Sequence, residues 1–167
     1  MTEFKPLDPT ACGLFFVAAI SLPLALGQLV NDPSVFPVLP SAEAFKVIGI
    51  CILVIALLAY LAGSNFGFTV FALVGAAVAL TGFGMGPVEN VTFALLYFIA
   101  IVWSIKIGTP KALAVICLTT GLVFLTVGLS GIIGGDYWHW LIGVSALLNF
   151  AFNLYLSVTL ALEKPAW

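Results

Sequence analysis

The sequence predicts an all-α integral membrane protein with six transmembrane helices, and two observations carry this prediction. The first is composition: 63% of the residues are hydrophobic and only 7% are charged, whereas a soluble domain carries about 25% charged residues. The second is the length of the apolar stretches, because a helix needs about 20 mostly apolar residues to cross a bilayer. Such stretches cover 11–30, 44–62, 66–83, 88–107, 111–130 and 138–162.

Turn-forming residues set the boundaries of these helices in order along the chain. The first helix contains Pro23, which is expected to kink it, and it ends before a proline-containing loop that begins at Asn31. Ser41 is placed to cap the second helix. Short glycine-containing segments separate the remaining helices, at 63–65, 82–87, 108–110 and 134–136. Because these connections are short, consecutive helices are expected to run antiparallel within a single domain, 1–167.

The lysines predict how the bundle is oriented. All five basic residues are lysines, and with six spans Lys5, Lys106, Lys111 and Lys164 fall on the side of the two termini, against Lys46 alone on the other. Cytoplasmic segments carry the excess of positive charge. We therefore expect a multi-pass protein of the cell membrane, plasma or inner, with both termini in the cytoplasm.

The residue content argues against several functions. A net charge of −2 provides no basic patch, so no nucleic-acid partner is expected. Cys12, Cys51 and Cys117 lie in three different helices without the spacing of a metal or redox site. The sequence contains no Ser-His-Asp cluster and no phosphate loop, so we expect no enzyme, no cofactor and no metal. Ionisable residues fall at the ends of the spans, which disfavours a primary pump.

The last helix carries the clearest polar pattern. Ser145, Asn149, Asn153 and Ser157 recur every four residues and therefore share one face. One interpretation is hydrogen bonding between helices, which stabilises many membrane bundles. The other is a polar lining for the path of a small solute. Further hydroxyl groups on other helices form a weaker set: Thr69, Thr119, Thr120 and Thr126.

One histidine stands at the start of the last helix, close to an acid. His139 follows Asp136 by three residues. Imidazole titrates near neutral pH, so this side chain could respond to pH. An ordinary histidine at the membrane interface is the favoured interpretation.

Two sequence blocks resemble the acetate uptake transporter family, the succinate–acetate permeases. The segment Asp8-Pro9-Thr10-Ala11-Cys12-Gly13-Leu14 is similar to the family's Asn-Pro-Ala-Pro-Leu-Gly-Leu motif at the start of the first helix. The segment Asn65-Phe66-Gly67-Phe68-Thr69-Val70-Phe71, followed by Gly75, is similar to its Phe-Gly-x-Thr-x-Phe entry to the third helix. A looser block runs from Gly108 to Gly128.

The resemblance implies an architecture and a substrate class. Family members are six-helix protomers, with one pathway each, that assemble as a ring-shaped homohexamer in the lipid bilayer. They carry small monocarboxylates such as acetate, and sometimes succinate, by proton-linked symport or as a channel. The helix starts near Pro9 and Phe66 would present backbone N–H groups to a carboxylate.

The resemblance also implies a narrow hydrophobic constriction on the pathway. Its three family positions correspond here to Val17, Val74 and Leu118. Two of them lack the aromatic ring of the family, so either a neighbouring ring refills the constriction, from Phe15, Phe16 or Phe71, or the neck is wider. Asn149, Asn153, Ser145 and Thr69 are then the candidate polar lining.

Two other functions remain open at this stage. Gly135-Asp136-Tyr137-Trp138 resembles the Gly-Asp-Trp-Trp turn of the amide and urea channels. That family, however, has a whole helix ahead of its Val-Asp-Pro segment, whereas Asp8-Pro9 stands near the first residue here. An accessory structural membrane subunit is the second alternative, because packed glycines and scattered asparagines would be enough for it.

Overall fold

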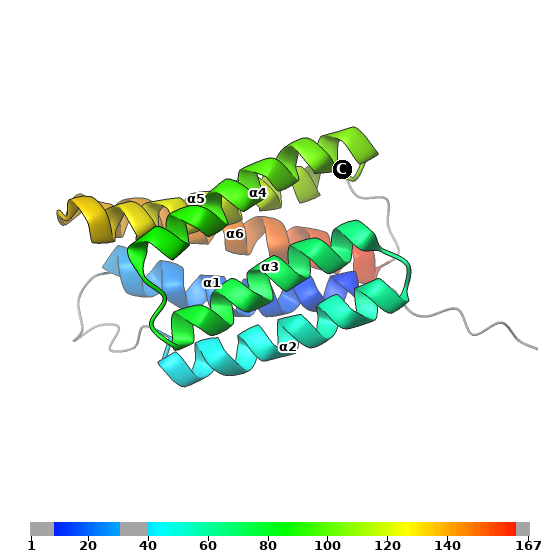
Figure 1. The fold of residues 1–167 in the computed structure, drawn as a ribbon, viewed down its shortest axis with the longest axis horizontal. Coiled ribbons are helices and arrows are strands. Elements are labelled where there is room, and N and C mark those ends of the chain that lie inside the picture. The colour runs from blue at the N-terminus through cyan, green and yellow to red at the C-terminus, as the bar shows by residue number, and fades with distance from the viewer. Residues whose placement is uncertain (1–8, 31–39, 163–167) are drawn as a thin grey trace, which may run out of the picture.

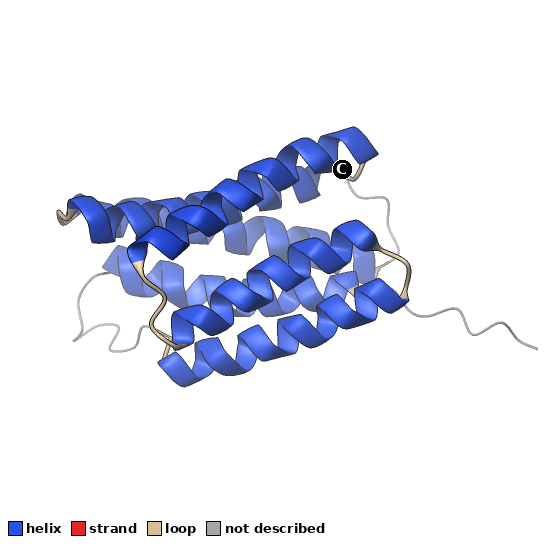
Figure 2. Cartoon of the chain, in the orientation of Figure 1, coloured by secondary structure: helices blue, strands red, loops and turns tan. Residues whose placement is uncertain are grey.

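In a computed structural model, which describes residues 9–30 and 40–162, the chain folds into six α-helices (Figures 1 and 2). Asp8 of the first motif, the loop after Asn31, and the terminal Lys5 and Lys164 of the orientation argument lie outside the described residues. The helices are α1 Thr10–Val30, α2 Ala42–Leu61, α3 Asn65–Gly82, α4 Pro87–Ile107, α5 Lys111–Ile133 and α6 Tyr137–Ala161.

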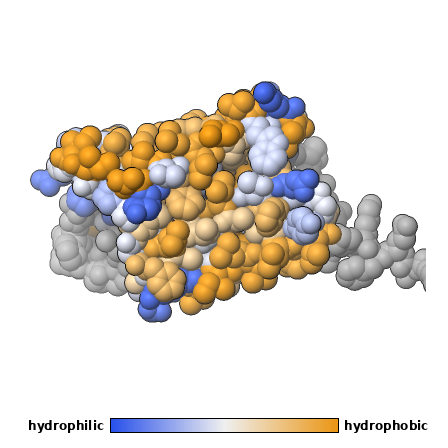
Figure 3. Space-filling model, viewed as in Figure 1, coloured by the Kyte–Doolittle hydropathy of each residue, from blue (hydrophilic) through white to orange (hydrophobic). Residues whose placement is uncertain are grey.

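The six predicted spans are confirmed, with one shift at the end of α5. This helix continues to Ile133, three residues beyond the predicted end, because the first residue with a left-handed backbone is Gly134 at φ 73°. Each helix is long and apolar enough to cross a bilayer. Hydrophobic residues cover the middle of the visible surface, and hydrophilic residues gather toward its two ends (Figure 3). The chain is a multi-pass membrane protein.

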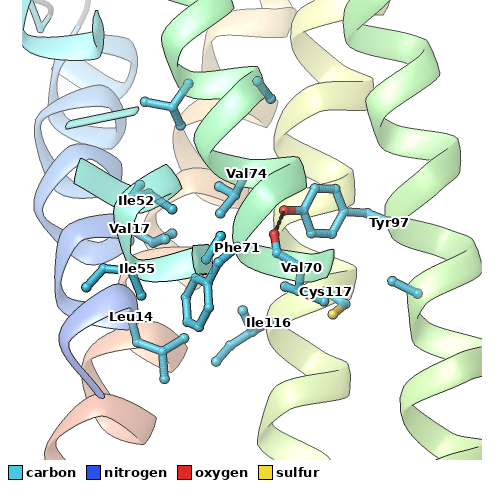
Figure 4. Close-up of a cluster of buried hydrophobic side chains, with 14 of the residues drawn as sticks. Leu14, Val17, Ile52, Ile55, Val70, Phe71, Val74, Tyr97, Ile116 and Cys117 are labelled. Carbon is cyan, nitrogen blue, oxygen red and sulfur yellow. Dashed lines mark hydrogen bonds between the residues drawn. The ribbon is translucent and has the colours of Figure 1, made fainter. Parts of the chain in front are cut away.

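The helices pack as three antiparallel pairs. The most extensive contacts join α2 to α3, α1 to α6 and α4 to α5, while α5 to α6 and α1 to α2 connect the pairs. In Figure 1, α2 and α3 lie on one side of the bundle and α4 and α5 on the other. The contact of α3 with α4 is slight, and the buried Tyr97 spans it by donating its hydroxyl proton to the carbonyl oxygen of Val70 at 3.1 Å (Figure 4).

Small residues bring α2 and α3 into backbone contact. A Cβ atom added at Gly49 would lie 2.7 Å from the Cα of Ala79, and one added at Gly75 would lie 2.9 Å from the backbone nitrogen of Leu53. Both distances are shorter than two non-bonded carbon or nitrogen atoms tolerate, so only glycine fits. Gly75 of the second motif therefore serves close helix packing, the usual role of small residues in membrane interfaces.

Buried apolar side chains close one half of the bundle. We use the name apolar plug for Leu14, Phe66, Phe71 and Ile116, all at most 7% exposed. In Figure 4, the ring of Phe71 lies near Leu14 of α1 and Ile116 of α5. An added Cβ at Gly13 would lie 2.7 Å from the Cζ of Phe71. The motif residues Gly13 and Leu14 thus pack against this ring.

Candidate functional site

A cavity of about 330 Å³ occupies the other half of the bundle, and residues of all six helices line it. On α1 its lining extends from Val17 to Gln28, and on α5 from Thr120 to Ser130. Because α1, α3 and α5 run in the same direction, these stretches extend from the middle of the bundle to the C-terminal ends of the three helices. The apolar plug lies on the opposite side of the middle: Leu14, Phe71 and Ile116 come one turn earlier on these helices, and Phe66 lies further toward the start of α3.

The deep end of the cavity lies at mid-bundle. We define it by Val17, Val74, Thr120 and Asn149, which border the cavity and are each at most 4% exposed. The two valines contribute methyl groups, and the other two residues contribute a hydroxyl and an amide. The deep end is therefore polar but uncharged: its side chains can form hydrogen bonds and none carries a charge.

Asn149 organises the polar groups around the deep end. Its side-chain oxygen accepts hydrogen bonds from the hydroxyls of Thr119 at 3.0 Å and Thr120 at 2.9 Å, and from the amide of Asn153 at 2.9 Å. Its amide nitrogen donates to the hydroxyl of Ser21 at 3.1 Å. That nitrogen carries two protons, so one more remains to be donated beyond the bond to Ser21.

The opposite end of the cavity is its mouth, defined by Gln28, Ser130 and His139. His139 Nδ1 lies 2.6 Å from Gln28 Oε1, which joins α6 to α1. The Ser130 hydroxyl donates to the carbonyl of Val127 at 2.8 Å, within its own helix. Phe45 of α2 and Asn90 of α4 also border the cavity.

Two of the three predicted constriction residues lie at the cavity. Val17 and Val74 both border the deep end. Leu118 is 42% exposed and does not border the cavity, so the prediction that it faces the same path is wrong for the protomer. Two residues along a helix turn the side chain by about 200°, and the inward positions of α5 are Ile116 and Thr120. Thr120 belongs to the weaker set of hydroxyl groups in the sequence. Its position four residues after Ile116 is the signal that both side chains share one face of α5.

Two of the three candidate aromatic residues have different surroundings. Phe71 is buried in the apolar plug, one turn before Val74 on α3. Phe16 is half-buried and packs against the same core. Neither borders the cavity, so the space beside Val17 and Val74 is not refilled by these rings.

The predicted polar lining is only partly brought together. Asn149 borders the cavity, whereas Ser145 and Asn153 do not. Asn153 is fully buried behind Asn149, and it also donates to the Asn149 carbonyl at 2.7 Å. Thr69 lies elsewhere and bonds the carbonyl of Asn65 at 3.0 Å, as threonines in membrane helices often do. Ser21 and Gln28 of α1 were missed because each is isolated in an apolar stretch and shows no periodic pattern.

Groups of the chain itself contact the two helix starts that were expected to face a carboxylate, and carboxylate binding there stays a prediction. The hydroxyl of Ser64 accepts from the backbone nitrogen of Gly67 at 3.1 Å and so caps this helix. Phe66 packs edge-on against Trp103, with ring centroids 5.1 Å apart. At α1, the carbonyl of Pro9 accepts from the nitrogen of Gly13 at 3.0 Å. Both helix starts lie at the end of the bundle opposite the mouth.

The electrostatic character of the cavity is simple. Among the described residues that line it, none is Asp, Glu, Lys or Arg, and His139 is the single ionisable one. Within the same described part of the chain, no group of three or more His, Cys, Asp or Glu side chains could hold a metal ion. The chemistry available is therefore hydrogen bonding by neutral groups, with one titratable ring at the mouth.

Comparisons with known proteins decide the fold. No protein-family model and no curated protein matches the sequence. Among solved structures, that of the bacterial acetate channel SatP superposes with a TM-score of 0.79 at 16% sequence identity, over 94% of this chain and 93% of that one. The chain has the fold of this acetate channel. The fold expected from the two sequence motifs is thereby confirmed.

Proposed function

We propose that this chain conducts small monocarboxylates, of which acetate is the first to test, across the membrane through the cavity and past the apolar plug. The observation that carries the proposal is the deep end, where an amide and a hydroxyl face a cavity between two valines in a fold shared with an acetate channel. A cavity of about 330 Å³ falls within the usual range for small-molecule sites, about 300–1,000 Å³.

The chemistry of the deep end suits the protonated form of a carboxylic acid. An ionised carboxylate would leave water without meeting an opposite charge there, which costs several kcal/mol. A neutral acid can accept from the Asn149 amide and donate to the oxygen of the Thr120 hydroxyl. Passage as the neutral acid would carry one proton with each solute, which is the proton-linked form of the proposal.

Assembly as a homohexamer belongs to the same proposal. Large apolar side chains on α2 and α4, including Val47, Ile50, Leu57, Leu95 and Ile99, are exposed in the protomer. Lipid or neighbouring copies would cover them. The cytoplasmic location of both termini stays a prediction from the lysines, and succinate as a second solute stays an expectation from the resemblance.

The test is acetate flux into vesicles reconstituted with purified protein, corrected for protein-free vesicles because acetic acid crosses lipid. Val74→Trp places a large ring in the deep end, so flux should fall at least tenfold while the oligomer elutes unchanged in size-exclusion chromatography. Leu118→Trp adds the same ring on the exposed face of α5 and should leave flux within about twofold of wild type. Equal flux in wild type and Val74→Trp would remove the deep end from the pathway.

A neutral amide fits the same uncharged lining. Urea flux measured in the same vesicles decides between these solutes. Urea passage without acetate passage would replace the carboxylate proposal by an amide channel. Passage of neither solute would favour an accessory subunit.

A further inference from the structure

The mouth of the cavity holds an imidazole fixed from a second helix. His139 of α6 and Gln28 of α1 are 111 positions apart in the sequence, and His139 Nδ1 lies 2.6 Å from Gln28 Oε1. An amide oxygen only accepts, so Nδ1 carries a proton in this contact. Nε2 is then the nitrogen at which the ring gains or loses its second proton. Both side chains are half-buried and both line the cavity, so water can reach the ring.

Few charges surround this ring. The sequence has one histidine, and the described residues of α1 include no charged side chain. On α6, Asp136 precedes His139 by one turn, and its carbonyl accepts from the His139 nitrogen at 3.3 Å. On α5, the single charged side chain is Lys111, at the opposite end of that helix.

The other charged groups that the structure describes at this end come from α2 and α4. On α2, Lys46 pairs with Glu43 at 2.8 Å. On α4, Glu89 lies in the first turn. Asp32, in the loop after α1, is outside the described residues. Among the described residues that line the cavity, His139 is therefore the one whose protonation places a positive charge there.

We propose that the mouth is a binding subsite for carboxylate anions, formed when His139 carries its second proton. Gln28 holds the ring through Nδ1, and the protonated Nε2 donates a charge-assisted hydrogen bond to a carboxylate oxygen. Nothing comparable exists at the deep end, where the polar groups are neutral. The inference rests on the proposed function: the mouth binds the anion that is abundant in water, and the anion takes up one proton, from His139 Nε2 or from water, before the deep end receives the neutral acid.

The single histidine makes the subsite directly measurable. The imidazole resonances of the protein in lipid nanodiscs report the titration of His139 alone, in the presence of sodium acetate, methanesulfonate, acetamide or chloride at equal ionic strength. By linkage, an anion that binds the protonated ring tenfold more tightly moves the titration midpoint up by one pH unit. We expect acetate and methanesulfonate to raise the midpoint by about that amount and acetamide to leave it at the chloride value.

The same midpoint in acetate and in chloride would overturn the proposal. Gln28→Leu keeps the ring but removes its support, and it should reduce the acetate-dependent shift by more than half. An undiminished shift in this variant would show that Gln28 takes no part.

Flux provides the second readout. As the external pH falls through the histidine titration, corrected acetate flux should rise in wild type and in Trp140→Phe, a change of an exposed neighbour outside the cavity. The fraction of neutral acid also grows as the pH falls, so part of the rise is expected in every variant. The ratio of wild-type flux to His139→Gln flux should itself increase as the pH falls through the histidine titration. A ratio that stays constant with pH would contradict the proposal. If wild type conducts no acetate, the proposed function fails, while the imidazole titration still decides whether the mouth binds the anion.

Discussion

The α2/α3 pair and the α1/α5/α6 group are held together by different interactions within one bundle. At α2/α3, glycines let backbones touch: an added Cβ at Gly49 would lie 2.7 Å from Ala79 Cα. At α1/α5/α6, Asn149 joins three helices by hydrogen bonds of 2.9–3.1 Å, and a cavity of about 330 Å³ lies beside it. Close packing of small residues stabilises through many weak contacts, whereas the polar group stabilises through few directed ones.

The difference indicates which kind of substitution each region tolerates. Packing at α2/α3 leaves no room, so added atoms are the harmful change there. Hydrogen bonds at Asn149 depend on particular atoms, so removed atoms are the harmful change on the other side. Three substitutions test this contrast.

The largest effect is expected from Gly49→Leu. The added side chain meets backbone atoms of Ala79 and has to push α3 away from α2. The cost should therefore lie at or above the upper end of the range for overpacking, about 3 kcal/mol. We expect loss of most folded protein after extraction in mild detergent, measured by size-exclusion chromatography. Val47→Leu, a change at an exposed position of the same helix, is the control and should be extracted normally. Normal yield of Gly49→Leu would show that the two helices can separate without cost.

An intermediate effect is expected from Asn149→Leu. Four side chains lose a partner, those of Ser21, Thr119, Thr120 and Asn153. A hydrogen bond between membrane helices contributes about 0.6 kcal/mol on average and up to about 2. We expect a destabilisation of about 1–3 kcal/mol in reversible denaturation, with folded protein still recovered. Acetate flux should fall by more than urea flux. Unchanged stability together with an unchanged ratio of the two fluxes would contradict the role given to this amide.

The smallest effect on stability is expected from Thr120→Val. The shape of the side chain is kept, and Asn149 Oδ1 still accepts from Thr119 and Asn153. Stability should change by less than about 1 kcal/mol. Acetate flux should nevertheless fall several-fold, because the hydroxyl at the deep end is gone. Wild-type acetate flux in this variant would assign the hydroxyl to helix packing alone.

The sequence predicted the spans well because a bilayer imposes a length on each apolar stretch. Five of the six helices begin and end within two residues of the predicted limits, and α5 alone extends further, to Ile133. The polar face of α6 was also visible, because four residues recur at the helical period. One of these four residues, Asn149, borders the cavity.

What the sequence could not provide is the relative rotation of the helices. The resemblance to the family is loose over α5, from Gly108 to Gly128, and it assigns Leu118 to the constriction. An error of two residues along this helix turns the side chain from the axis to the surface. Gln28 and His139 are far apart in the chain, and no local pattern on α1 indicated that they meet. Such contacts depend on how two helices dock, which the periodicity of either helix does not determine.

On the proposed pathway, the apolar plug limits the rate of transport. Phe71 is buried between Gly13, Leu14 and Ile116. On the proposed pathway, a solute that travels along the axis therefore has to wait until this ring moves aside. Rearrangements of packed side chains and helices take far longer than the diffusion of a small molecule over a few ångströms. Throughput then depends on how often the barrier opens, and it rises more steeply with temperature than flow through a permanently open, water-filled pore.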